Sequence, residues 1–240
     1  MYQDKFYRKK ESNSFFNRWK NNNSEFNTSQ KIIRPYKKKI LNILKSKLNL
    51  KKKKVLEIGP FIGDLLWTLK KEYKCDVYGI EPSSLACSYA KKYYSLKIEN
   101  STLLQSKLFN LNKKNKEKFD IIVCDDVLSW LDRSCILSCI GVMDWMLKPN
   151  GHIFIRDFSP PLNFAYPNHH WEKEKIFNFK QKNGHMQFFI DSGKYLKTFN
   201  KKYITSKYQK VSIKNKLGIT WSDVVIKKVK NFTHPIKKIK

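Results

Sequence analysis

The sequence predicts an α/β fold, in which a mostly parallel sheet carries helices on both faces. Two observations lead to this class. Short apolar segments of strand character alternate with segments whose apolar residues recur at helical spacing. In addition, a short strand runs directly into a glycine turn and a helix at residues 55–63. Strands that alternate with helices form βαβ units with parallel strands and right-handed crossovers.

The first half of the chain gives three strands and three helices. Residues 36–48 are expected to form an amphipathic helix, because Ile40, Ile43, Leu44 and Leu48 recur at helical spacing. Strand and helix then alternate, and residues 96–103 are read as the third strand. The expected strands are 55–58, 77–80 and 96–103, and the two helices after the first are 63–74 and 84–94.

The second half continues the alternation and then changes character. Residues 119–124 form a buried strand, and Asp132 is the expected N-cap of a helix whose apolar residues recur every three or four positions. Residues 148–151 end that helix, and a strand begins at His152. Residues 159–200 show no clean period. Residues 203–213 and 219–229 are then expected to form a terminal hairpin.

The charge is large but unevenly placed. Lys+Arg number 49 against 20 Asp+Glu, a net charge of +29, yet only five of the basic residues are arginine. Lysine and asparagine share A/T-rich codons, so we attribute most of the lysine to genome composition. Arginine, which makes bidentate phosphate contacts, is scarce. Residues 55–159 carry 14 basic and 13 acidic side chains, so a near-neutral centre lies between two basic flanks.

Other features of composition favour a cytoplasmic protein. No apolar run reaches the ~18 residues that a membrane-spanning helix needs. The polar N-terminus lacks the apolar core of a signal peptide. The five cysteines are odd in number and form no Cys-x-x-Cys, which suits a reduced compartment and argues against a zinc ribbon. We therefore expect no metal site.

The glycine turn and the acidic residue after the second strand are the strongest candidates for ligand binding. Gly59 allows a ligand to approach the backbone, and Gly63 allows the helix to pack closely on the strand. The turn matches neither a phosphate-binding loop nor Gly-x-Gly-x-x-Gly, and Glu57 before it can meet a cationic ligand. Glu81 stands where an acid can bind both hydroxyls of a ribose. The alternative for Glu81 is a solvated carboxylate at a strand end.

Two further segments, residues 124–131 and 147–158, follow in order. The four segments together resemble the class I S-adenosylmethionine-dependent methyltransferases, over about residues 36–158. The resemblance implies S-adenosylmethionine as cofactor and a Rossmann-like, seven-stranded sheet of order 3-2-1-4-5-7-6 whose last strand is antiparallel. It also implies that the cofactor lies across the carboxyl ends of the first strands.

The same resemblance implies the cofactor-binding residues. Two positions depart from the family pattern: Ser101 and Thr102 replace the usual Gly-Asp beside the adenine, and Phe61 replaces the middle glycine of the turn. Phe61 either closes the turn over the cofactor or weakens binding. The implied residues are Glu57, Gly59, Pro60, Phe61, Gly63, Glu81, Pro82, Ser101, Thr102, Asp125, Asp126 and Val127.

A narrower resemblance extends beyond residue 158. Three segments are similar to a bacterial subgroup of small-molecule methyltransferases that often accompany surface-glycan or secondary-metabolite genes. They are Asp157-Phe158-Ser159-Pro160-Pro161, His169-His170-Trp171 and Phe177-Asn178-Phe179-Lys180. Residues 1–35 would form an irregular basic arm, and residues 36–240 one methyltransferase domain. Within it we expect a cofactor-binding core at 36–158, an acceptor-side insertion at 159–200, the hairpin at 201–230 and a basic tail at 231–240.

The expected reaction moves a methyl group to a hydroxyl or amine of a small, anionic metabolite or glycan precursor. His169 and His170 are the candidate bases, with His185 as a weaker one, and Asp157 could orient a histidine. Two alternatives stay open: an RNA methyltransferase whose basic flanks bind phosphates, and a non-catalytic module of the same fold, suggested by Phe61. The sequence does not predict the oligomeric state. An anion-attracting rim is expected at Lys173, Lys175, Lys180, Lys182, Lys214 and Lys216.

Overall fold

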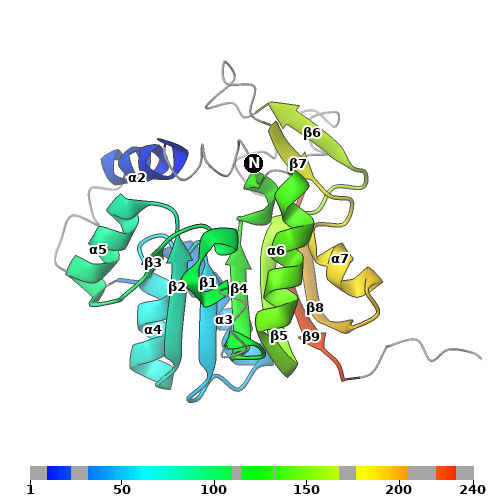
Figure 1. Ribbon diagram of the computed structural model, residues 1–240, viewed down its shortest axis with the longest axis horizontal. Helices are drawn as coiled ribbons and strands as arrows, with labels where there is room; N and C mark the ends of the chain where they lie inside the picture. Colours follow the sequence, from blue (N-terminus) through cyan, green and yellow to red (C-terminus); the bar gives the residue numbers. More distant parts are fainter. Residues whose placement is uncertain are drawn as a thin grey trace, which may run out of the picture.

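The described residues form a single main sheet with helices on both faces (Figure 1). The computed structural model describes residues 10–22, 32–109, 115–131, 133–167, 177–204 and 220–230. In them, seven strands take the order β3-β2-β1-β4-β5-β9-β8. A separate hairpin, β6–β7, precedes β8, so this order equals the predicted 3-2-1-4-5-7-6. Strand β9 is antiparallel to both neighbours, and the predicted fold is confirmed.

Four parallel strands occupy the middle of this sheet. Their apolar residues are buried on both faces, since helices cover both, and they therefore read as nearly continuous apolar runs. Their carboxyl ends lie at the same edge of the sheet. The strands are β1 (Lys54–Ile58), β2 (Asp76–Glu81), β4 (Phe119–Asp125) and β5 (Leu147–Phe158).

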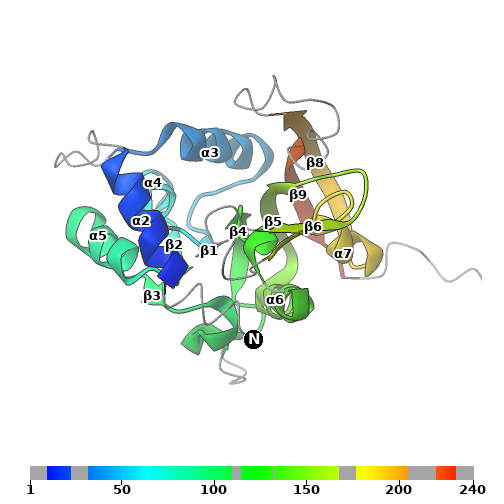
Figure 2. The same cartoon turned by 90° about the horizontal axis from the view of Figure 1, so that it is seen from above.

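The helices divide between the two faces (Figure 2). Helices α3 (Pro35–Lys47) and α4 (Asp64–Tyr73) pack their apolar stripes on one face, and α5 (Ser84–Tyr94) packs beside α4. Helices α6 (Arg133–Met146) and α7 (Met186–Asp191) cover the other face. No helix in the described ranges is long and apolar enough to cross a membrane.

The N-terminal arm differs from the prediction. Residues 12–21, expected to be irregular, form helix α2 (Ser12–Asn21). Phe16 and Trp19 stand three residues apart on its inner face and pack against Phe61 and Tyr89, which explains why this polar segment is helical. Helix α2 therefore lies over α5 and the glycine turn (Figure 2).

Some strands begin or end away from the predicted positions. Strand β3 is reduced to Glu99–Asn100, and β5 already begins at Leu147, so residues 148–151 belong to the strand. Strand β8 (Tyr195–Ile204) starts eight residues before the predicted 203–213, because this edge strand is exposed and lacks apolar alternation. Strand β9 (Thr220–Lys228) lies within the predicted 219–229, and residues 205–219 lie outside the described ranges. Residues 159–200 also contain β6 (Phe164–Pro167) and β7 (Phe177–Lys180).

Candidate functional site

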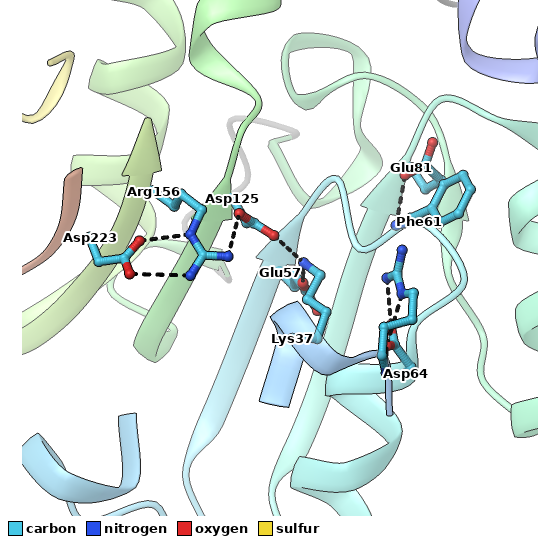
Figure 3. A network of polar contacts seen from close by, with 9 residues as sticks. Lys37, Glu57, Phe61, Asp64, Glu81, Asp125, Arg156 and Asp223 are labelled. Atoms are coloured by element: carbon cyan, nitrogen blue, oxygen red, sulfur yellow. Dashed lines mark hydrogen bonds and ion pairs between the residues drawn. The ribbon is translucent and has the colours of Figure 1, made fainter. Parts of the chain in front are cut away.

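The segments predicted to carry function meet at one edge of the sheet. The glycine turn follows β1, Glu81 ends β2, Asp125 ends β4, and Asp157 lies near the end of β5. Neighbouring registers pair Ile58 with both Ile80 and Cys124. Because the strands are parallel, these ends lie at the same edge of the sheet, where Figure 3 shows Glu57, Glu81 and Asp125.

Lys37, in the first turn of α3, joins two of these strand ends (Figure 3). Its Nζ lies 2.6 Å from Oε1 of Glu57 and 2.8 Å from Oδ2 of Asp125. All three side chains are buried. Burial alone would lower the pKa of Lys37, but the carboxylates of Asp125 and Glu57 outweigh burial and raise it. Lys37 is therefore a buried ammonium ion at neutral pH.

Arg156 on β5 extends this network to β9. Its Nε lies 2.7 Å from Oδ1 of Asp223, and its Nη1 lies 3.7 Å from Oδ1 of Asp125. Burial alone would raise the pKa of Asp125, yet Lys37 and Arg156 lower it. Two cations, Lys37 and Arg156, thus pair with three carboxylates, so the network has fewer positive than negative groups. The carboxylates are those of Glu57, Asp125 and Asp223.

One carboxylate oxygen of Glu57, Oε2, is the atom of this network that points to a ligand. Its Oε1 accepts the Lys37 hydrogen bond, whereas its Oε2 is buried without a hydrogen-bond partner among the described residues. Burial raises the pKa of Glu57, and Lys37 opposes this rise. A buried polar atom without a partner costs about 1–3 kcal/mol. A ligand that brings an N–H group or a positive charge would remove that cost.

Glu81 lies against the glycine turn and is not a solvated carboxylate. Its Oε2 accepts from the Phe61 backbone N–H and its Oε1 from that of Ser83, both at 2.9 Å. Burial raises the pKa of Glu81 to about 7, and these two hydrogen bonds oppose the rise. Each carboxylate oxygen can accept a second hydrogen bond, so Glu81 keeps acceptor sites for ribose hydroxyls, and ribose binding stays a prediction.

Phe61 takes the left-handed backbone conformation, with φ of 58°, where the family pattern has glycine. Its ring packs against Phe15, Phe16 and Trp19 of α2, and the guanidinium of Arg34 lies 5.0 Å from the ring centre. The ring thus joins the turn to α2, and α2 closes over this part of the site.

Arg34 also fixes the start of α4. Its Nε and Nη2 donate to the two carboxylate oxygens of Asp64 at 2.9 and 2.5 Å, and its backbone N–H donates to the same group. Burial alone would lower the pKa of Arg34, but Asp64 raises it. This buried pair positions the chain before α3 against the turn after β1.

Gly59 brings the turn after β1 against the segment after β4. Its φ is 68°, and a Cβ there would lie 2.7 Å from Cγ2 of Val127. Asp126 is also left-handed, and its Oδ1 accepts from Nε1 of Trp130 at 3.1 Å. Burial raises the pKa of Asp126 to about 7, although Lys180 lowers it.

The remaining predicted cofactor residues surround these groups, and their contact with a cofactor stays a prediction. The Pro60 carbonyl accepts from Gly63, the left-handed N-cap of α4. The Ser101 N–H donates to the Glu81 carbonyl, and the Pro82 carbonyl accepts from Asn100. Thr102 Oγ1 is buried without a partner in the described part of the chain.

Asp157 binds a histidine, but not one of the two first considered. His185 Nδ1 and Ser129 Oγ both contact its carboxylate, and all three side chains are buried. Burial alone would raise the pKa of Asp157, but His185 lowers it. His169 and His170 lie outside the described residues. The structure therefore brings together Asp157 and the weaker candidate, His185.

Lys180, predicted on a rim, is instead buried among aromatic rings. Its Nζ lies 3.4 Å from the centre of the Phe158 ring and 5.6 Å from that of Trp130. Burial lowers the pKa of Lys180 to about 8, although Asp157 and Asp126 raise it. Lys182 is exposed, and Lys173, Lys175, Lys214 and Lys216 lie outside the described residues.

Sequence reasoning missed four residues of the site: Lys37, Arg34, Asp223 and Ser129. Lys37 belongs to a run of three lysines, of which only it is buried, and it occupies the same helix face as Ile40, Leu41 and Leu44. A lysine in the apolar stripe of a helix was the available clue. The structure pairs Arg156 with the carboxylates of Asp223 and Asp125.

Comparison with known proteins identifies the family of this chain. A family profile described as "Methyltransferase domain" matches residues 29–203, most of the chain. The chain belongs to the class I S-adenosylmethionine-dependent methyltransferases. An uncharacterized protein of Rickettsia prowazekii (strain Madrid E) is 33% identical over 104 residues, which is 42% of this methyltransferase. The match spans 41% of that relative's length.

Solved methyltransferase structures share the fold. The 1,6-didemethyltoxoflavin-N1-methyltransferase of Burkholderia thailandensis has a TM-score of 0.61 and 12% identity, with 91% of this chain and 87% of that chain covered. The N-methyltransferase NodS of Bradyrhizobium japonicum WM9 has a TM-score of 0.54 and 16% identity, covering 80% and 85%. Magnesium protoporphyrin IX methyltransferase of Synechocystis PCC 6803 has a TM-score of 0.58 and 12% identity, covering 94% of each.

The residues of this methyltransferase fit the cofactor of the family. S-adenosylmethionine carries a sulfonium, an ammonium group and a ribose. The open Oε2 of Glu57 and the excess of carboxylates around it suit the cationic groups. Glu81 suits the ribose, because its carboxylate is held by backbone N–H groups beside the turn.

Proposed function

We propose that this methyltransferase transfers a methyl group from S-adenosylmethionine to a hydroxyl or amine of a small, anionic metabolite or glycan precursor. The observation that carries the proposal is the unpartnered Oε2 of Glu57, buried beside the glycine turn in a network short of positive charge. A cationic cofactor completes that network.

The position of each residue at its strand end suggests which part of the cofactor it would contact. Glu57 would accept from the cofactor's ammonium, Glu81 would bind the ribose, and Asp125 to Val127 would line the methionyl side. When bound, S-adenosylmethionine supplies an electrophilic methyl group. The protein's task is to align acceptor and methyl group and to exclude water, and alignment lowers the barrier by about 7–11 kcal/mol in favourable cases.

The acceptor side lies between β4 and β5. Lys180 supports an anionic acceptor, because it places a cation among Phe158 and Trp130 next to Asp157. Nε1 of Trp221, which stacks on Phe158, is buried without a partner in the described ranges, so a further donor is available for an anion. Two of the structural neighbours are named as N-methyltransferases. The proposal therefore includes an amine as well as a hydroxyl as the acceptor group.

Location and domain organisation belong to the same proposal. The five cysteines are all free, which supports a reduced, cytoplasmic setting. The domain would span residues 36–240, and α2 would be an appendage that covers the cofactor side.

The test is calorimetric titration with S-adenosylhomocysteine. Wild-type protein is expected to bind at micromolar concentration, and Glu57→Gln is expected to weaken binding at least about tenfold, because one charge-assisted contact is worth about 1.5–3 kcal/mol. Glu72→Gln, an exposed carboxylate on α4, is the control and should bind as wild type does. Absence of binding by the wild type would instead favour the non-catalytic module.

An RNA acceptor would be recognised by the salt dependence of binding. A protein that holds 6–10 phosphates loses about 10³–10⁵ in affinity between 50 and 200 mM salt, because counterions are released on binding. A small anionic acceptor makes one or two charge contacts and should lose far less. Methylation of RNA, with RNA binding that falls this steeply as salt rises and with small acceptors inert, would contradict the proposal.

A further inference from the structure

Asp157 is held from three elements at the carboxyl end of β5. The hydroxyl of Ser129 and the backbone N–H of Phe158 both donate to its Oδ1, and His185 Nδ1 bonds its Oδ2. Ser129 lies in the short helix after β4, and His185 is the N-cap residue of α7. Both carboxylate oxygens are therefore hydrogen-bonded, and these contacts hold the group against the imidazole.

This arrangement fixes the tautomer of His185. A carboxylate accepts but does not donate, so Nδ1 carries the proton and Nε2 keeps its lone pair when the ring is neutral. The arrangement is not that of a serine hydrolase, because Ser129 binds the carboxylate and not the imidazole. Ser129 thus acts as an anchor, and the basic atom is Nε2 of His185.

The pair stands beside the methyl-transfer side of the site. Ser129 comes two residues after Val127, whose side chain lies against Gly59 of the glycine turn. Asp157 follows Arg156, which belongs to the ion network of the cofactor side. The other charged groups around the pair are Lys180 on β7 and Asp126 after β4, and the negative charge of Asp157 raises the pKa of each.

We infer that His185 is the general base of the reaction and that Asp157 and Ser129 are its positioning residues. This inference rests on the proposed function. The proton of the acceptor's hydroxyl or amine moves to Nε2 of His185, and the acceptor atom keeps the electron pair. That pair forms the bond to the methyl group of S-adenosylmethionine, the former carbon–sulfur pair stays on sulfur, and the imidazolium releases its proton to water. Such a base is worth about 10²–10⁴-fold in rate.

The first test reads the tautomer by ¹⁵N NMR of histidine-labelled protein without substrate. For the neutral ring we expect the His185 Nε2 signal at the position of an unprotonated nitrogen and Nδ1 at that of a protonated one. Asp157→Asn should reverse the two, since an amide can donate to Nδ1. A wild-type His185 with the proton on Nε2 overturns the inference.

The second test distinguishes two roles for His185: a general base, or a structural residue that only holds the start of α7 in place. Diethyl pyrocarbonate modifies an accessible, unprotonated imidazole nitrogen, and peptide mass spectrometry locates the product. The His185 side chain is almost fully buried in this structure, but an acceptor must still reach the Nε2 of a general base. His185 should therefore react in the native protein, and Asp157→Asn should slow this reaction at least about tenfold. His152, which lies on β5 five residues before Asp157 and pairs with Ile121 of β4, is the control whose rate Asp157→Asn should not change.

The outcomes distinguish this inference from the proposed function. If His185 reacts only after unfolding while S-adenosylhomocysteine still binds, the base assignment fails and the methyltransferase proposal stands. If S-adenosylhomocysteine does not bind, the proposed function fails first. Should Asp157→Asn not fold, the tautomer and the native reactivity of wild-type His185 still decide the matter.

Discussion

Lys37 and Glu57 form an ion pair with 2.6 Å between Nζ and Oε1, and almost no surface of either side chain reaches solvent. Taking two charges out of water is costly, and their attraction repays this only when the geometry is good and the other hydrogen bonds are made. Here Asp125 accepts a second contact from Lys37, whereas Glu57 keeps one oxygen open. The pair therefore positions α3 against β1 and β4 at the cofactor side.

Lys37→Met is expected to reduce the free energy of unfolding by about 3–5 kcal/mol, because it leaves the buried carboxylates of Glu57 and Asp125 without their cation. Urea denaturation measures the loss. Lys38→Met, at the exposed neighbouring position, is the matched control and should change stability by less than about 0.5 kcal/mol. The double variant Lys37→Met/Glu57→Gln should recover part of the loss, and strict additivity of the two changes would contradict the pairing.

Phe61→Gly is expected to release α2 from the glycine turn. Glycine removes the strain of the left-handed residue, about 1–2 kcal/mol, but the loss of the ring contacts with Phe16 and Trp19 is larger, about 3–5 kcal/mol. Trypsin should then cleave α2 after Arg18 or Lys20 several times faster than in the wild type. Phe15→Ala, whose ring is half exposed, should have a smaller effect. An unchanged cleavage rate would show that Phe61 does not hold α2.

The central strands were predictable because burial on both faces leaves an apolar run that needs no knowledge of neighbours, as at residues 119–124. Strand β8 was placed too late because an edge strand with exposed lysines carries no such pattern. Glu57, Glu81, Asp125 and Asp157 could be named since each lies at or close to the carboxyl end of a predicted strand. Lys37 and Ser129 could not be named from the sequence, because their contacts depend on tertiary packing. Lys37 binds Glu57, 20 residues away, and Ser129 binds Asp157, 28 residues away.

Glu81 is expected to make stability fall as the pH rises towards neutral. Its folded-state pKa of about 7 lies above the ordinary 4.5, so the folded protein holds the proton more tightly than the unfolded chain. This contribution is fully present below about pH 4.5 and is lost as the pH rises through about 7. Urea midpoints between pH 5 and 7.5 should therefore fall less steeply in Glu81→Gln than in wild type.

The control for this pH dependence is Glu72→Gln, which changes an exposed carboxylate of α4 and should leave the slope unaltered. A Glu81→Gln slope equal to that of the wild type would show that Glu81 titrates alike in the folded and unfolded states, and would remove the case for a buried, proton-holding acid beside the turn.

Gly59→Ala is expected to destabilise the protein through two separable effects. The left-handed backbone costs about 1–2 kcal/mol for a residue with a Cβ, and that Cβ would meet Cγ2 of Val127 at 2.7 Å. Val127→Ala removes the second effect alone, so the double variant should be more stable than the two single losses predict, by about 0.5–3 kcal/mol. Gly141→Ala on α6, where a Cβ meets nothing within 4 Å, should instead stabilise by up to about 1 kcal/mol. Strict additivity of Gly59→Ala and Val127→Ala in urea denaturation would show that the turn after β1 and the segment after β4 are not packed together, and the cofactor side would then lack the wall that these two residues form.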